Sequence, residues 1–259
     1  MKKVLFALMI IIIFGYGLPS PEGSQMMPGA YKMLSQLVND TVVTGTNQLK
    51  IYTENYMMYG DLNSRDSVSS FGIGSYSESD AKVIENVIFR GSGNNTTTNE
   101  QPVELDIKKT TKGYIQVIPE LGQDPGQKIK LTEEYEKVGT TVKSPLDGAW
   151  KETLSYGVRG KDTAKNQLTQ YKIYYGGNFL WGHTYTDSAK KTQTAVGFGT
   201  FKMNGSNKMA ETVATCTYSS IVGKTFDIDF TMNGNDQFQL TGTFSPGTKS
   251  VEVYQRLKK

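Results

Sequence analysis

The residues of this sequence that are best suited to chemistry are glutamates that stand among tyrosines and apolar residues. Alternate residues of a β-strand share one face, and two segments would place a carboxylate, a tyrosine and a cation on such a face: Glu252, Tyr254 and Arg256, and Glu133, Tyr135 and Lys137. Two further glutamates would share a face with apolar side chains: Glu211 with Met209 and Val213, and Glu85 with Val83 and Val87. A carboxylate among apolar neighbours costs free energy unless it is paired. Arg256 and the tyrosine hydroxyls are the available partners.

Two interpretations of these polar groups stay open. In the first, they form a buried network that holds the fold together. In the second, they are a polar anchor at the base of a ligand cavity. The sequence does not decide which strand face points inward, because an outward face can also be apolar where two units touch.

The sequence indicates neither a metal site nor a catalytic centre. His183 is the only histidine and Cys216 the only cysteine, and one of each, far apart, is a poor basis for a transition-metal site. No nucleophile elbow, phosphate loop or HExxH motif is present. We therefore expect no metal or cofactor, and we interpret His183, which would share a face with Phe179 and Trp181, as a structural or rim residue.

Aromatic residues crowd the start of the second half of the sequence, where most would be core and some could line a cavity mouth. Together with the glutamates they make up the candidate ligand-binding residues. In the second half these candidates are Trp150, Tyr174, Trp181, His183, Glu211, Glu252, Tyr254 and Arg256; in the first half they are Tyr31, Glu85, Glu133 and Tyr135.

The two halves of the chain are repeats of one another. "KIYTENYMMYG" at 50–60 matches "KIYYGGNFLWG" at 172–182, and "GIGSY" at 72–76 matches "GFGTF" at 197–201. The offset is 119 both at the first match, "GAYK" with "GAWK", and at the last, "TEEYEKV" with "VEVYQRL". Two duplicated domains explain a repeat of this length better than a solenoid, whose period is about 20 to 50 residues.

Eight strand-like runs follow one another in the second repeat, and hairpin signals such as Gly176-Gly177, Asn204-Gly205 and Asn233-Gly234 separate several of them. The runs are 149–155, 168–175, 178–184, 194–203, 208–216, 225–231, 236–243 and 250–257. Eight sequential antiparallel strands should close into an up-and-down barrel, since closure removes exposed edges. The first repeat keeps this order, with a longer polar loop at 90–102.

The fold class predicted is therefore all-β, with two tandem eight-stranded antiparallel barrels. The domains expected are a barrel at 24–138, a polar linker at 139–147 and a barrel at 148–259. The Gly148-Ala149-Trp150 opening, the Gly-x-Gly strand and the Glu-x-Tyr end resemble bacterial secreted lipocalin-like domains of the calycin type. The first repeat has Gly29-Ala30-Tyr31 at the opening, which departs from that pattern.

The final strand, Glu252-Val253-Tyr254-Gln255-Arg256, is similar to the last strand of fatty-acid-binding proteins. The resemblance implies a site where an arginine and a tyrosine hold a ligand carboxylate. Here Glu252 and Glu133 stand in place of that arginine, and two carboxylates repel an anion. We therefore expect any ligand to be neutral or cationic, and fatty acids to bind poorly.

The first residues have the pattern of a secretory signal peptide: Lys2 and Lys3, then an apolar run from Val4 to Phe14, with cleavage after Gly17. Residues up to about 23 would be flexible. The run is short for a membrane span, and no cysteine lies just after the signal, so no lipid would tether the mature chain. We expect an exported bacterial protein, periplasmic or extracellular, that is not a lipoprotein.

Three functions remain in competition. The leading hypothesis is a non-enzymatic binding protein that holds a small apolar or amphipathic ligand in a barrel. The others are a structural or protein-interaction module with filled barrels, and an enzyme of the isomerase or dehydratase type that uses Glu211, His183 or Tyr254. A formal charge of +3 is too small to indicate nucleic acid as a partner.

Overall fold

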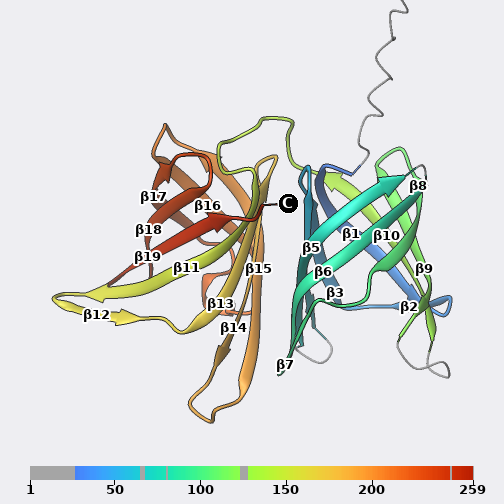
Figure 1. Ribbon diagram of the computed structural model, residues 1–259, viewed down its shortest axis with the longest axis horizontal. Helices are drawn as coiled ribbons and strands as arrows, with labels where there is room; N and C mark the ends of the chain where they lie inside the picture. The colour runs from blue at the N-terminus through green and yellow to red at the C-terminus, as the bar shows by residue number, and fades with distance from the viewer. Residues whose placement is uncertain (1–26, 65–67, 80, 123–127, 246, 259) are drawn as a thin grey trace, which may run out of the picture.

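The computed structural model describes residues 27–64, 68–79, 81–122, 128–245 and 247–258. The predicted signal peptide lies outside these residues. The described chain forms two closed antiparallel β-barrels of eight strands each, side by side (Figure 1). This confirms the fold class that the repeats predicted. Apart from one 3-10 turn, η1 (Ser219–Ile221), the described residues form strands and their connections, and no described helix is long and apolar enough to cross a membrane.

Each strand of the first barrel pairs with the next in the chain, and the last pairs with the first to close the barrel. Two short strands, β2 (Thr41–Val43) and β7 (Asn95–Thr98), extend β1 and β6 as hairpins. The expectation of a loop over 90–102 was therefore wrong, because β6 continues to Ser92 and turns back into β7. The barrel strands are β1 (Gly29–Val38), β3 (Thr46–Tyr52), β4 (Tyr56–Asn63), β5 (Ser69–Ser79), β6 (Lys82–Ser92), β8 (Val103–Lys109), β9 (Gly113–Leu121) and β10 (Ile129–Val138).

The second barrel has the same order, and β19 pairs with β11 to close it. All eight expected strands are present. Strand β12 (Asp162–Lys165) was not predicted; it is a hairpin extension of β11 that projects from the barrel (Figure 1). The barrel strands are β11 (Gly148–Arg159), β13 (Leu168–Tyr175), β14 (Asn178–Thr186), β15 (Thr192–Met203), β16 (Lys208–Cys216), β17 (Thr225–Asn233), β18 (Gln237–Ser245) and β19 (Thr248–Arg256).

The repeated Gly-x-Gly motif has a steric cause. A Cβ atom at Gly197 would lie 2.4 Å from the ring of Trp181, and one at Gly72 would lie 2.5 Å from the ring of Tyr59. The second glycine of each motif sits at a bulge, where a Cβ at Gly199 would lie 1.9 Å from the carbonyl oxygen of Thr212. The motif therefore makes room for an inward aromatic ring and for a sharp bend of the strand.

The two barrels pack on each other through a shared apolar cluster, in which the same strands of each repeat face each other. A Cβ at Gly182 would lie 2.2 Å from Phe71, and one at Gly60 would lie 2.6 Å from Val196. Gly60 and Gly182 hold equivalent positions, as do Phe71 and Val196. Such reciprocal packing of equivalent residues is the signature of a two-fold interface, here between two halves of one chain.

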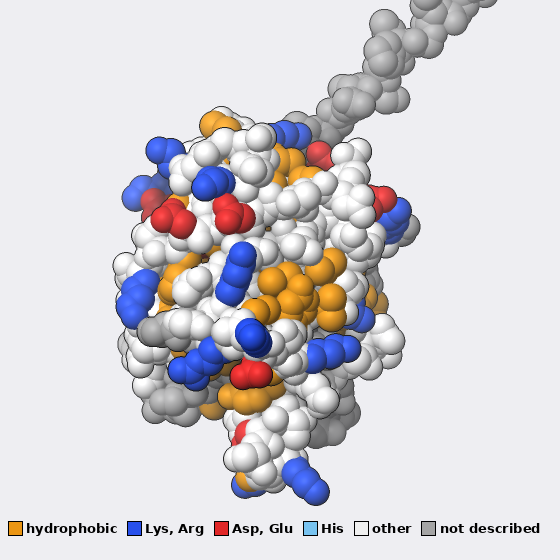
Figure 2. Space-filling view, turned by 90° about the vertical axis from the view of Figure 1, so that its left-hand side faces the viewer, with side chains coloured by type: hydrophobic (Ala, Val, Ile, Leu, Met, Phe, Trp, Pro, Cys, Tyr) orange, Lys and Arg blue, Asp and Glu red, His pale blue; other side chains and the backbone are white. Residues whose placement is uncertain are grey.

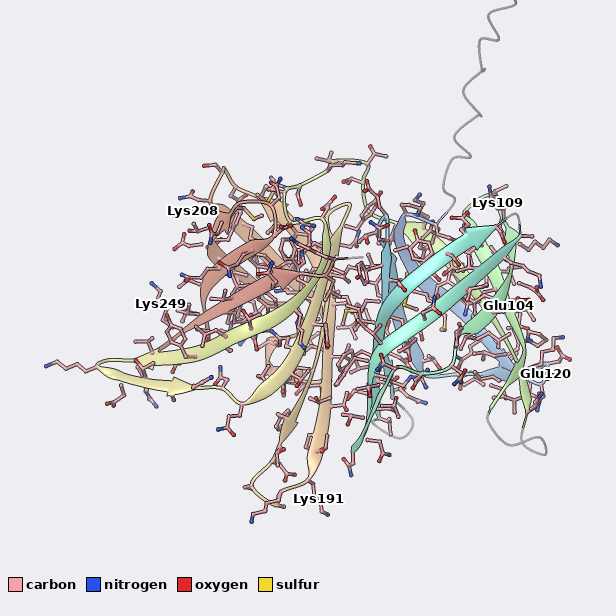
Figure 3. All side chains as sticks on the ribbon, in the orientation of Figure 1. Glu104, Lys109, Glu120, Lys191, Lys208 and Lys249 are labelled. Atoms are coloured by element: carbon pink, nitrogen blue, oxygen red, sulfur yellow. The ribbon has the colours of Figure 1, made fainter. Side chains whose placement is uncertain are left out.

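Most charged side chains lie outside the barrels, as the labelled Glu104, Lys208 and Lys249 show (Figure 3). On the outer face of the second barrel, apolar side chains gather in the middle and lysine or arginine side chains surround them (Figure 2). The few charged groups inside the barrels are therefore the exceptions that need a physical account.

Candidate functional site

The repeated Lys-Ile-Tyr segment builds a buried ion pair in each barrel. In the second barrel, Lys172 Nζ lies 2.8 Å from Glu211 Oε1, to which Tyr174 also donates a hydrogen bond of 2.6 Å. In the first barrel, Lys50 Nζ lies 2.8 Å from Glu85, and Tyr52 donates to the same carboxylate. The four charged side chains are at most 7% exposed.

The Lys-Ile-Tyr segment occurs in both repeats because each of its three residues makes the same kind of contact in both barrels. Lysine and tyrosine point inward and hold the glutamate of β6 or β16. The isoleucine between them points outward, and both Ile51 and Ile173 are fully buried in the cluster between the barrels. Strands β3 and β13 are thus buried on both faces.

A second polar group in the first barrel surrounds Glu133. Its Oε1 accepts a hydrogen bond of 2.8 Å from Gln36, and its Oε2 accepts bonds of 2.6 Å from Gln116 and 2.9 Å from Tyr135. Gln48 donates in turn to the Tyr135 hydroxyl. Amide and hydroxyl donors thus occupy both carboxylate oxygens, which makes this group a closed structural network.

The second barrel has a different arrangement around the equivalent Glu252. Tyr254 donates to Glu252 Oε2 at 2.6 Å. The Gln170 amide nitrogen lies 3.4 Å from the same oxygen and 3.3 Å from Glu152 Oε1, and it also donates to Tyr254. Two carboxyl groups therefore converge on one amide nitrogen.

Three substitutions between the repeats produce this difference. Glu152 stands where the first barrel has Met33, so a second carboxyl is added. Ser155 replaces Gln36 and Leu240 replaces Gln116, so two amide donors are lost.

Burial and the proximity of Glu252 raise the pKa of Glu152 to about 8. Burial also raises the pKa of Glu252, against the opposing effect of the Lys172 cation and the hydrogen bond from Tyr254. At neutral pH Glu152 therefore keeps its proton.

The barrel wall is open beside this pair. Strands β11 and β13 pair only over Gly148–Lys151 and Tyr171–Tyr174; beyond that point β11 pairs with β12 and diverges from β13. A cavity of about 560 Å³ occupies the divergence. Hydroxyl and amide side chains dominate its lining, with Glu152 and Lys165 as the charged groups and Phe89, Leu154 and Leu168 as apolar ones. The volume is in the range of small-ligand sites.

The equivalent divergence in the first barrel, between β1 and β3, is bridged by side chains. Gln36 spans it, because its amide nitrogen reaches Glu133 and its amide oxygen accepts a hydrogen bond of 3.3 Å from Thr46 on β3. The second barrel has the shorter Ser155 at this position, and the Ser155 hydroxyl accepts a hydrogen bond of 2.9 Å from the Asn166 amide. One barrel is thus closed where the other is open.

His183 forms part of the wall behind Gln170. Its Nδ1 lies 2.9 Å from Gln170 Oε1 and its Nε2 lies 2.8 Å from the Tyr218 hydroxyl, and its ring stacks on Trp181. Because an amide oxygen only accepts, Nδ1 carries the proton and Nε2 accepts from Tyr218. With both nitrogens engaged, His183 orients Gln170 so that the amide nitrogen faces the carboxyl pair.

Burial lowers the pKa of His183 to about 4, against 6.5 for an exposed histidine. The unfolded chain then binds a proton that the folded chain excludes, so this residue should cause stability to fall as the pH drops from 6.5 towards 4, by roughly 3 kcal/mol in all. We expect the gap in unfolding free energy between the protein and its His183→Phe variant to narrow from pH 7 to pH 5. A histidine proton resonance that titrates near pH 6.5 would contradict this.

Arg256 is not the partner of the inward carboxylates, and that expectation was wrong. Its guanidinium donates to the backbone carbonyls of Asn235, Asp147 and Pro145 and lies 3.9 Å from the centre of the Trp150 ring. It therefore ties the linker to the closed end of the second barrel.

The other predicted residues all lie in the barrel interiors. Trp150, Tyr174 and Tyr254 pack around Phe238 in the second barrel, and Tyr31 and Tyr135 pack around Tyr114 in the first. These rings fill the barrel ends rather than line a cavity. Of the twelve predicted residues, the structure brings Glu252, Tyr254 and His183 together around Gln170, and Glu211 lies one step away through Lys172.

The sequence analysis missed Lys50, Lys172, Gln48, Gln170 and Glu152. The first four stand in the repeated segment or two residues before it, as Gln-x-Lys-x-Tyr, and this shared spacing was the available signal. Glu152 had none, because the first repeat has Met33 in its place. The described residues contain no group of three or more acidic, histidine or cysteine side chains that could hold a metal ion.

No family model matches the sequence, and no curated protein is significantly similar to it. The barrel architecture and the geometry of the second barrel therefore carry the functional argument.

Proposed function

We propose that this chain is an exported, non-enzymatic binding protein of the lipocalin-like type. Its second barrel holds a small amphipathic ligand, neutral or cationic, in the opening between β11 and β13. Its first barrel is a structural partner that adds Phe89 and Thr96 to the lining of this opening. Eight-stranded up-and-down barrels are a common scaffold for binding one small ligand.

One observation carries this proposal: the divergence between strands is bridged by side chains in the first barrel and holds a cavity in the second. Gln36 bridges the divergence in the first barrel, whereas a cavity of about 560 Å³ with Glu152 in its wall occupies that of the second. Polar groups that served only to close a barrel would be paired in both repeats. The carboxyl pair disfavours an anion, and the phenyl and leucine side chains of the lining give a short apolar group a place to pack.

The opening can be blocked with one substitution that has a matched control. Leu168→Trp adds a large side chain to the lining, whereas Thr46→Trp makes the same kind of change at the equivalent position of the first barrel. We expect native mass spectrometry of protein purified from its own host to show a retained small molecule. Leu168→Trp should remove it and Thr46→Trp should keep it. A ligand lost from Thr46→Trp and kept by Leu168→Trp would place the site in the first barrel and contradict the proposal.

A further inference from the structure

We infer that the ligand presents a primary ammonium group to the carboxyl groups of Glu152 and Glu252. The inference rests on the proposed function and names the chemical class of its ligand.

The geometry of the pair suits a nitrogen that carries several hydrogens. Glu152 Oε1 and Glu252 Oε2 both lie within 3.4 Å of the Gln170 amide nitrogen, so they already converge on an N–H donor. Glu152 also lines the cavity, so a donor that enters there meets the Glu152 carboxyl group, beside which Glu252 lies. An ammonium group offers three N–H donors, whereas a hydroxyl offers one.

The charge around the pair favours a cation over an anion. The interior near the pair has one cation, Lys172, and three carboxyl groups: Glu152, Glu211 and Glu252. Lys172 is already in an ion pair with Glu211. Side chains from four strands face Glu152 and Glu252: Gln170 and Lys172 from β13, Tyr254 from β19, Glu211 from β16 and Ser155 from β11. His183 from β14 lies behind Gln170. The outer face carries both basic and acidic side chains (Figure 2), so we expect selectivity for a cation to come from the buried carboxyl groups.

The same geometry excludes a metal ion as the natural occupant. The Gln170 amide oxygen is held by His183, so the nitrogen, which cannot ligate a cation, faces the carboxyl pair.

The protonation of Glu152 determines how many protons are released when the ligand binds. Before binding, Glu152 holds a proton. A bound ammonium stabilises the ionised form of Glu152, so the proton leaves Glu152 for solvent. The site gains the charge of +1 that the ligand carries and loses the charge of the proton, so its net charge does not change. Binding near pH 7 should therefore release about one proton, and the release should vanish above the pKa of Glu152.

The test is calorimetric titration of the full chain near pH 7 with hexylamine, 1-hexanol and hexyltrimethylammonium, in two buffers of different protonation enthalpy. We expect hexylamine to bind at least about tenfold more tightly than the other two, since a hydrogen bond to a charged group contributes roughly 1.5–3 kcal/mol. Only hexylamine should release a proton. Glu152→Gln should abolish both the preference and the release, and the exposed Glu104→Gln should keep both.

Failure of the inference can be told apart from failure of the proposed function. Equal binding of hexylamine and hexanol that Leu168→Trp abolishes would overturn the ammonium assignment and leave the site in place. Hexylamine binding that is unchanged in Leu168→Trp would overturn both. Circular dichroism of Glu152→Gln checks its fold, and a folded variant that still releases a proton would also overturn the inference.

Discussion

Replacing Lys172 with methionine should lower the free energy of unfolding by about 3–5 kcal/mol. The substitution keeps the length of the side chain and removes its charge, so the Glu211 carboxylate is left inside the barrel with Tyr174 as its donor. Glu211 is 4% exposed. An uncompensated buried charge costs this much, whereas the intact pair by itself contributes little.

The double variant Lys172→Met/Glu211→Gln distinguishes this account from a loss of packing. An amide can still accept from Tyr174 and carries no charge, so the double variant should be more stable than Lys172→Met alone, by at least about 1 kcal/mol. Exposed Lys208, 3.8 Å from Asp229, is the control: Lys208→Met should stay within about 0.5 kcal/mol of the parent protein. Urea denaturation measures all three. Equal effects of Lys172→Met and Lys208→Met would refute the prediction.

The same comparison shows whether the barrels unfold together. Lys50 occupies the equivalent place in the first barrel, 2.8 Å from Glu85. If the barrels unfold separately, Lys50→Met shifts one transition and Lys172→Met the other. If the interface couples them, either variant shifts a single transition. We expect one transition, because the cluster between the barrels is fully buried at its centre.

The barrel strands were predictable from the sequence because hairpin glycines and the repeat mark their ends. Gly176 and Gly177 adopt positive φ angles of 56° and 79°, as the turn between two strands requires. The inward face was not predictable in β3 and β13, because both of their faces are buried. Alternation of apolar and polar residues fails when a second barrel replaces solvent.

The candidate site was predicted only in part for the same reason. Lys172 lies on a strand whose two faces are both buried, so the alternation of its residues does not tell which face points inward. Only the Gln-x-Lys-x-Tyr spacing that the two repeats share marks it. Arg256, by contrast, shares a strand with Glu252 and was expected to pair with it, but it stands at the end of β19, opposite Trp150, and lies over that ring. The carboxyl pair depends on Glu152, which the repeat does not share, and on a divergence of strands that no local pattern encodes.

Phe71→Ala should be the most damaging substitution at the interface between the barrels, with a loss of about 3–5 kcal/mol of stability. Phe71 is fully buried, and its ring fills the space that a side chain at Gly182 would occupy. Truncation leaves a cavity between two rigid sheets, which cannot collapse to fill it. The exposed linker residue Val142 provides the control, since Val142→Ala should change stability by less than about 0.5 kcal/mol.

The contact between Phe71 and Gly182 allows a second substitution to restore part of the stability that Phe71→Ala removes. Gly182→Leu alone should destabilise the protein, because its Cβ would lie 2.2 Å from Phe71. In the Phe71→Ala background the same leucine enters the vacated space, so the double variant should be at least about 1 kcal/mol more stable than Phe71→Ala. Thermal and urea unfolding of the four variants measure these differences. Additive effects of Phe71→Ala and Gly182→Leu would show that the two residues do not share one space. In that case the barrels would meet only as loosely tethered domains, and separate halves 24–140 and 141–259 should fold as well as the whole chain.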